Sequence, residues 1–219
     1  MNLLPAKALL RKIFPSAQLV RLERAVGPFV RRLAPADLRV LATVTGSDKW
    51  GGHWYAQHYQ THFAPLRPKA LNLLEIGVGG YDDPNKGGSS LRMWKTFFPR
   101  ANVFAIDIVD KRALQEPRIK IYQGSQDDAE FLGRVAADIG RIDIIIDDGS
   151  HQNQHVLKTF AVLFPLLADG GIYVVEDTQT SYWPSYGGTS EEFNSPKSTM
   201  GFFKGLADCL NYEEFLKKD

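Results

Sequence analysis

Apolar runs that are long enough for buried strands alternate, from residue 71 onward, with segments that have helical spacing. The runs cover residues 71–78, 103–110, 118–124, 141–148 and 172–177. Between them, residues 90–98, 128–140 and 155–171 repeat apolar side chains at the spacing of amphipathic helices. Strands that are apolar along their whole length and alternate with helices predict a parallel sheet covered on both faces. We therefore predict an α/β fold with a Rossmann-like, doubly wound parallel sheet.

The first 44 residues have a different character. Basic side chains outnumber acidic ones there, and Pro15, Pro28 and Pro35 interrupt apolar residues at helical spacing. We expect a short basic N-terminal helical region at 1–44 and one α/β domain at 45–219, because a chain of 219 residues suggests one domain. The N-terminal region is interpreted as helices with solvated arginines. A subunit contact or a weak contact with an anionic membrane are the alternatives.

Charge, cysteine content and hydropathy restrict the classes of function. A formal net charge of +1 gives no electrostatic case for nucleic acid as a partner. Cys209 is the sole cysteine, which excludes a disulfide within one chain and disfavours a zinc site built from cysteines. No apolar run reaches the roughly 18 residues of a membrane-spanning helix, and the charges near Met1 follow the apolar residues, which is the wrong order for a secretory signal. We expect a cytoplasmic protein that makes no membrane contact, unless the basic N-terminal region provides one.

Charged or small polar residues end each predicted strand. In chain order they are Glu75, Gly77 and Gly79; Asp107; Gly124, Ser125 and Gln126; Asp147, Asp148 and His151; Glu176 and Asp177. The carboxyl ends of parallel strands meet at the edge of the sheet where this fold binds ligands. Unpaired buried carboxylates are costly, and acids from several strands repel one another unless cations or hydrogen-bond donors lie between them. The pattern therefore predicts a ligand site at this edge.

Three of these acids suggest a metal site. The carboxylate oxygens of Asp148, Glu176 and Asp177 suit Mg²⁺, Mn²⁺ or Ca²⁺, and there is no thiolate set to favour zinc. His151 follows Asp148 closely and is a candidate general base, because imidazole titrates near neutrality. A cation and a histidine together can generate an alkoxide from an alcohol. The alternative is that His151 begins a helix and bonds only to backbone.

The glycines after the first predicted strand indicate the cofactor. A dinucleotide-binding fingerprint would need a third glycine where this chain has Asp82. The E-x-G-x-G-G pattern instead resembles the first motif of S-adenosylmethionine-dependent methyltransferases, in which an acid at the end of the second strand binds the ribose hydroxyls. Asp107 occupies that position here.

Longer segments carry a closer resemblance. The segments EIGVGGYDDPNKGGSSLRMWKTFFP, IDDGSH and YVVEDTQTSYWPSYGG resemble the metal-dependent sugar O-methyltransferases of macrolide biosynthesis, of the mycinamicin and macrocin type, and the resemblance spans residues 45–190. Cephalosporin-hydroxylase-like proteins share much of this pattern. The resemblance implies a class I methyltransferase fold, S-adenosylmethionine and Mg²⁺ as cofactors, a homo-oligomer, and a sugar acceptor that chelates the metal through two neighbouring hydroxyls.

The resemblance also implies roles for individual residues. Asp148, Glu176 and Asp177 would hold Mg²⁺, and His151 would be the general base. The residues that would line the cofactor are Glu75, Gly77, Gly79, Asp107, Gln126 and Asp147, with Ser89 or Ser90 near its methionine end. Residues 45–59 would contact cofactor or sugar, or else anchor the N-terminal helices, and the polar loop at 178–193 would form a lid over the substrate.

Methyltransferases of this fold normally have two further strands after the fifth. Residues 202–219 have the spacing of a helix instead, so we expect a sheet that lacks the last two strands, in a natural short form or a truncated one. The expected function is methyl transfer from S-adenosylmethionine to a sugar hydroxyl of a glycosylated natural product or glycan. The alternatives are a methyltransferase that acts on a lipid-linked acceptor and a non-catalytic relative that binds the cofactor.

Overall fold

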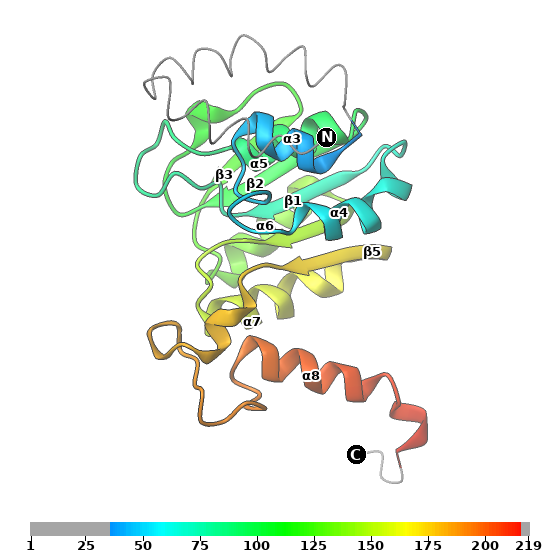
Figure 1. Cartoon of the computed structure of the whole chain (residues 1–219), viewed down its shortest axis with the longest axis vertical. Helices are drawn as coiled ribbons and strands as arrows, with labels where there is room; N and C mark the ends of the chain where they lie inside the picture. Colours follow the sequence, from blue (N-terminus) through cyan, green and yellow to red (C-terminus); the bar gives the residue numbers. More distant parts are fainter. Residues whose placement is uncertain (1–35, 216–219) are drawn as a thin grey trace. The chain divides into compact units, whose positions relative to one another are not determined.

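A five-stranded sheet organises the computed structural model, which describes residues 36–215 (Figure 1). The strands are β1 (Asn72–Ile76), β2 (Asn102–Asp107), β3 (Ile119–Gln123), β4 (Ile142–Asp147) and β5 (Leu167–Val175). Their order in the sheet is β3-β2-β1-β4-β5, and β4 runs parallel to both β1 and β5. The first strand, β1, thus lies at the centre of the sheet, and the later strands are added on both sides of it. This order confirms the predicted doubly wound fold.

Helices alternate with the strands as the sequence pattern predicts. They are α3 (Leu38–Thr45), α4 (Ala56–Phe63), α5 (Ser89–Phe97), α6 (Ala129–Ile139), α7 (Asn153–Leu163) and α8 (Thr199–Cys209). Short 3-10 turns lie at Ala64–Leu66, Arg112–Leu114, Phe164–Leu166, Thr178–Tyr182, Pro184–Tyr186 and Tyr212–Glu214. Within residues 36–215, no helix has the length and apolar character that a bilayer crossing requires.

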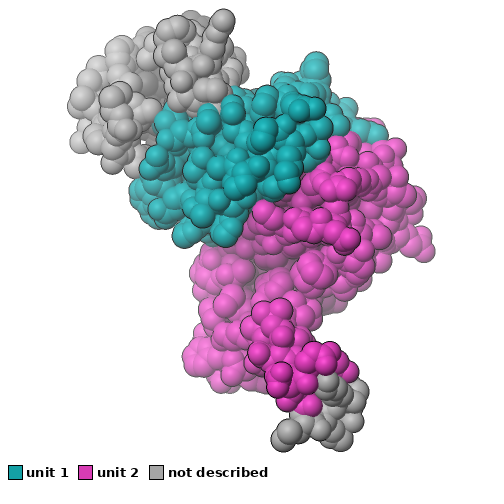
Figure 2. All heavy atoms as spheres, turned by 90° about the vertical axis from the view of Figure 1, so that its right-hand side faces the viewer, with its two compact units in different colours: residues 1–71, 78–103, 113–120 teal, residues 72–77, 104–112, 121–219 magenta. Residues whose placement is uncertain are grey.

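The chain divides into two compact units (Figure 2). Residues 1–71, 78–103 and 113–120 form unit 1, and residues 72–77, 104–112 and 121–219 form unit 2. In unit 1 the core is aromatic: the ring centroid of Trp94 lies 4.9 Å from that of Tyr59 and 5.6 Å from that of Phe63. Because Tyr59 is buried against α5, the end of the 45–59 segment is an aromatic anchor for the helices of this unit.

In unit 2 the core is aliphatic. Two helices, α6 and α7, pack on apolar side chains of β1 and β4. The buried cluster consists of Leu74, Ile76, Ile106, Leu132, Val135, Ala136, Ile139, Ile142, Ile145 and Leu163. Asp128 caps α6, since its carboxylate accepts a hydrogen bond from the Phe131 N–H at 2.9 Å. This core holds the carboxyl ends of β1, β4 and β5, which carry most of the predicted site.

The bounds of two helices were predicted wrongly. The helix expected at 155–171 is α7, which begins at Asn153 and ends at Leu163, and β5 already starts at Leu167. Pro165 stands in the 3-10 turn between them and cannot donate a backbone hydrogen bond, so the helix stops although the apolar spacing continues. The helix expected at 202–219 begins at Thr199 and ends at Cys209.

The predicted N-terminal helical region at 1–44 falls largely on residues 1–35, which lie outside the described residues. Its last part is described and belongs to α3, where the carboxylate of Asp37 accepts hydrogen bonds from the backbone N–H groups of Arg39 and Val40. The division of the chain at residue 44 stays a prediction. Among the described residues the sheet has five strands, as expected.

Candidate active site

Three of the predicted site residues gather where β4 and β5 end, in unit 2. Asp148, His151 and Asp177 each offer one ligand atom, and these atoms all lie within 4.8 Å of one another. The Nε2 atom of His151 is 3.9 Å from Asp148 Oδ1 and 3.5 Å from Asp177 Oδ2. All three side chains are half-buried. Two carboxylates and an imidazole at this spacing form a donor set that fits a divalent cation.

The backbone at two of these residues is strained. His151 has φ of 57° and Asp177 has φ of 51°, in the left-handed region that residues with a Cβ rarely adopt. Such a conformation persists only where the surroundings hold it in place, and it concentrates at functional sites. Because the two residues come from different loops and meet in one cluster, the strain supports a functional role for this cluster.

Glu176 has a different position from its neighbour Asp177. Its side chain is buried, and its backbone N–H donates to the carbonyl oxygen of Asp147 at 2.9 Å. Among residues 36–215, the group of potential ligands that the fold brings together consists of Asp148, His151 and Asp177. The predicted role of Glu176 as a metal ligand therefore stays a prediction.

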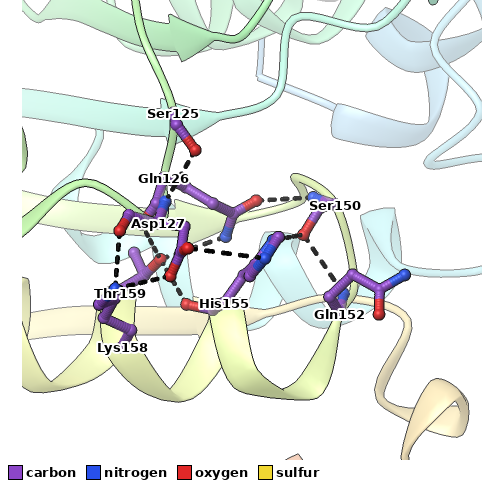
Figure 3. Close-up of polar contacts among 8 residues, drawn as sticks. All are labelled: Ser125, Gln126, Asp127, Ser150, Gln152, His155, Lys158 and Thr159. Atoms are coloured by element: carbon purple, nitrogen blue, oxygen red, sulfur yellow. Dashed lines mark hydrogen bonds and ion pairs between the residues drawn. The ribbon is translucent and has the colours of Figure 1, made fainter. Parts of the chain in front are cut away.

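Gln126 and Asp147 form a buried polar network beneath the cluster. The Gln126 amide Nε2 donates to Asp147 Oδ1 at 3.2 Å and to Thr159 Oγ1 at 3.1 Å, while its Oε1 accepts from the Ser150 N–H at 2.7 Å. Figure 3 shows the Gln126 side chain turned toward Ser150 and Thr159. The network fastens the turn between Asp148 and His151 to β4 and α7.

The carboxyl group of Asp147 is only 1% exposed, and burial raises its pKa to about 7. Hydrogen bonds from Gln126 and from the Gly149 N–H oppose this shift, and the negative charge of Asp148 adds to it. With its pKa near 7, the Asp147 carboxyl is partly protonated at neutral pH, which limits the negative charge that gathers beneath the cluster.

The second histidine of the IDDGSHQNQH stretch has a structural position. His155 Nδ1 lies 2.9 Å from Ser150 Oγ (Figure 3). The Lys158 ammonium donates a hydrogen bond to Asp127 Oδ1 at 2.8 Å. The hydrogen bond from Lys158 holds the pKa of the Asp127 carboxyl below its usual value. These bonds tie the start of α7 to the turns after β3 and β4, so the contacts of His155 are structural.

The other predicted cofactor residues of unit 2 lie at the ends of β1 and β2. Glu75 is fully buried within β1, and the Asp107 carboxylate accepts a hydrogen bond from the Val109 N–H at 2.9 Å. Gly77 has φ of 93°, and a Cβ placed on it would lie 2.2 Å from the carbonyl oxygen of Asp148. Only glycine fits there, so Gly77, the first glycine of the motif, allows the loop to pass directly beside Asp148, a predicted metal ligand.

The remaining predicted residues belong to unit 1. Gly79 has φ of 74°, and a Cβ placed there would meet no atom within 4 Å, so its backbone is open to a ligand. Ser89 and Ser90 begin α5, just after the Gly88 N–H, which donates to the carbonyl oxygen of Val78 at 2.7 Å. The glycine-serine loop thus folds back onto the start of the glycine motif.

The sequence pattern did not identify one buried residue next to this site. Asn153 is the first residue of α7 and is almost fully buried, with hydrogen bonds to three separate segments. An asparagine near a helix start is usually interpreted as a cap, and its partners become visible only in three dimensions.

Comparison with known proteins decides the family. The family model described as rhamnosyl O-methyltransferase/CmcI matches residues 60–205. The chain belongs to this family. Its fold is that of class I methyltransferases: the solved structure of the MycE methyltransferase from the mycinamycin biosynthetic pathway, in complex with Mg, SAH and mycinamycin VI, superposes with a TM-score of 0.81. The two are 46% identical, over 83% of this chain and 47% of that one.

Two curated relatives agree with this assignment. The 8-demethyl-8-alpha-L-rhamnosyl tetracenomycin-C 2'-O-methyltransferase of Streptomyces olivaceus is 49% identical over 197 residues, which cover 87% of this chain and 52% of that protein. The mycinamicin VI 2''-O-methyltransferase of Micromonospora griseorubida is 47% identical over 179 residues, which cover 81% of this chain and 45% of that protein. This chain therefore spans about half the length of the curated relatives that it matches.

Proposed function

We propose that this chain is a divalent-metal-dependent O-methyltransferase that transfers a methyl group from S-adenosylmethionine to a sugar hydroxyl of a glycosylated natural product. The observation that carries the proposal is the cluster of Asp148, His151 and Asp177 at the carboxyl ends of β4 and β5, on a class I methyltransferase fold. The relatives support it, since their names describe O-methyltransferases of rhamnosyl tetracenomycin C and of mycinamicin VI.

The donor set fits a hard divalent cation. Asp148 and Asp177 would bind the ion through carboxylate oxygens, and we propose Glu176 as a third carboxylate ligand. When bound, Mg²⁺ would lower the pKa of a coordinated acceptor hydroxyl. The MycE structure that this fold matches contains Mg and SAH, which supports the choice of Mg²⁺ and S-adenosylmethionine.

His151 would take the proton from the acceptor hydroxyl. Its Nε2 faces both carboxylates, at 3.5 and 3.9 Å, so an acceptor oxygen that approaches these acids also approaches the imidazole. The two carboxylates would stabilise the imidazolium that forms. The oxygen, once deprotonated, would then attack the sulfonium methyl group in line, so that the bond between sulfur and the methyl carbon breaks and S-adenosylhomocysteine leaves.

The cofactor would lie along the ends of β1 and β2. We propose Glu75, Gly77, Gly79 and Asp107 as its neighbours, with Ser89 or Ser90 near the methionine end. The open surroundings of Gly79 and the position of Asp107 at the end of β2 support this assignment. The predicted cofactor residues Gln126 and Asp147 would act from beneath, because their side chains bond to each other and to the turn at Ser150.

We propose that the acceptor is a sugar attached to a small natural product. We also propose that the protein is a cytoplasmic homo-oligomer. The names of the curated relatives support the sugar acceptor.

The test is methyl transfer to rhamnosylated tetracenomycin and to mycinamicin VI, measured by mass spectrometry with Mg²⁺ and with a chelator. We expect metal-dependent transfer, and His151→Gln should reduce turnover by about 100-fold or more while S-adenosylmethionine affinity stays within a few-fold. The matched control is His155→Gln, four residues further along in the first turn of α7, which should keep most of the activity. Full activity of His151→Gln would refute the assignment of the base, and cofactor binding without turnover on any sugar would favour a non-catalytic relative.

A further inference from the structure

The Asn153 side chain connects three segments that are distant in the sequence. Its Nδ2 donates to the carbonyl oxygens of Thr180 at 3.1 Å and Tyr186 at 2.8 Å. Its Oδ1 accepts from the Thr199 N–H at 2.7 Å. Asn153 is only 1% exposed, so both amide hydrogens and the amide oxygen are used inside the protein.

One of these bonds leads directly to a proposed metal ligand. Thr180 lies in the 3-10 turn Thr178–Tyr182, which begins immediately after Asp177. Both the backbone N–H and the hydroxyl of Thr180 donate to the carbonyl oxygen of Asp177, at 3.1 and 2.9 Å. Asn153 is therefore linked by hydrogen bonds, through a single intermediate residue, to the backbone of Asp177, which has an unfavourable left-handed conformation.

The segment that precedes the same helix carries another member of the cluster. His151 stands two residues before Asn153, in the segment that leads into α7. Its own left-handed φ places its Nε2 at 3.5 Å from the Asp177 carboxylate. Asn153 is thus a buried residue through which the segment after β4 is hydrogen-bonded to the loop after β5.

The loop after β5 is anchored by further buried polar groups. Ser181 Oγ accepts from the Met200 N–H at 2.9 Å, and both Ser181 and Thr199 are buried. A Cβ placed on Gly188 would lie 2.4 Å from the Ser181 carbonyl oxygen, so the backbone is tightly packed. These contacts pack the loop after β5 against the starts of α7 and α8.

We propose that Asn153 is a positioning residue that sets Asp177 against Asp148 and His151. The inference rests on the proposed function, because it assumes that these three residues form the metal and base site. Without the amide, the carbonyl oxygens of Thr180 and Tyr186 lose a buried donor, and the turn after Asp177 relaxes. Asp177 would then leave its left-handed conformation, and its carboxylate would move away from the metal position.

The test compares Asn153→Ala and Asn153→Asp with a neighbouring control in the full chain. Asn153→Asp has nearly the same shape and keeps the acceptor for Thr199, but it loses both donors, so it tests the idea even if Asn153→Ala folds poorly. The control is Gln152→Ala, since the half-buried Gln152 also bonds the same loop, through Nε2 to the carbonyl oxygen of Ser185 at 3.3 Å. The readouts are Mn²⁺ affinity by electron paramagnetic resonance, amide hydrogen exchange across residues 178–186, and S-adenosylmethionine affinity in a chelator.

We expect both Asn153 variants to bind Mn²⁺ at least about tenfold more weakly and to exchange amides in residues 178–186 at least about tenfold faster. Their S-adenosylmethionine affinity without metal should stay within about twofold, and Gln152→Ala should match the wild type in all readouts within about twofold. Faster exchange with unchanged Mn²⁺ affinity would overturn the inference and leave Asn153 a purely structural residue. A wild-type chain that binds no Mn²⁺ would overturn the proposed metal site itself, and the inference with it.

Discussion

Replacement of Gly77 by alanine should disturb the proposed metal site through a backbone contact. The new Cβ would lie 2.2 Å from the carbonyl oxygen and 2.9 Å from the carbonyl carbon of Asp148, and Cβ atoms essentially never come within 3.0 Å of other heavy atoms. The Asp148 backbone would have to move away by about 1 Å. This shift would also strain the hydrogen bond that the Asp148 N–H donates to the carbonyl oxygen of Ile76 at 3.0 Å. A displacement of about 1 Å in a catalytic site can lower the reaction rate by about 100-fold.

The magnitude has two parts. Alanine at the φ of 93° costs about 1–2 kcal/mol of backbone strain. Forcing two packed backbone segments apart costs about 1–3 kcal/mol more. The matched control is Gly46→Ala, because Gly46 has φ of 76° at the end of α3, and its added Cβ would meet only Ser89 Oγ, at 4.0 Å. Gly46→Ala therefore carries the strain without the collision.

The assay is urea unfolding together with Mn²⁺ titration of each folded variant. Gly77→Ala should lower the free energy of unfolding by about 2–5 kcal/mol, the sum of the two parts, and should weaken Mn²⁺ binding about tenfold or more. Gly46→Ala should lower the free energy of unfolding by about 1–2 kcal/mol and leave Mn²⁺ affinity unchanged. Equal loss of stability in both variants, with wild-type Mn²⁺ affinity in Gly77→Ala, would refute the reasoning.

Three further predictions follow from the network and the helix cap. Because burial raises the pKa of Asp147 to about 7, ionisation is disfavoured in the folded chain, so the free energy of unfolding in a chelator should fall as the pH rises from about 4 to about 7. Asp147→Asn should remove that part of the slope, and identical slopes in urea melts of both proteins would contradict the raised pKa. Gln126→Leu should leave the Ser150 N–H without its acceptor at 2.7 Å, so the Ser150 amide should exchange faster and Mn²⁺ should bind more weakly. Wild-type values of both quantities would show that the network does not hold the turn. Asp128→Ala should lower the free energy of unfolding by about 1 kcal/mol through loss of the bond to Phe131, while unchanged stability would argue against the cap.

The strands were predictable because their signal is local. A continuous apolar run such as IIID in β4 is buried on both sides, and the acids that follow it necessarily reach the edge of the sheet. The end of α7 was not predictable from periodicity, because apolar spacing continues through Pro165 into β5. The proline itself was the available signal, and it correctly marks the end of the helix.

The site was predictable in its composition and less so in its geometry. Asp148, His151 and Asp177 could be selected because each follows a strand, and the structure brings them together. The left-handed backbone of His151 and Asp177 is not indicated by any local sequence pattern. The buried amide of Asn153 belongs to the same class, since its partners lie 27 to 46 residues away along the chain.

Metal-dependent methyl transfer is the measurement that tests the central claim most directly. The full chain would be incubated with methyl-labelled S-adenosylmethionine and a rhamnosylated acceptor in a chelator, and then with Mg²⁺ restored. The proposed function predicts that one labelled methyl group appears on the sugar only when Mg²⁺ is present, and that Asp148→Asn with Asp177→Asn abolishes the transfer. Transfer that is as fast in the chelator as in Mg²⁺, or that survives both substitutions, would contradict the account.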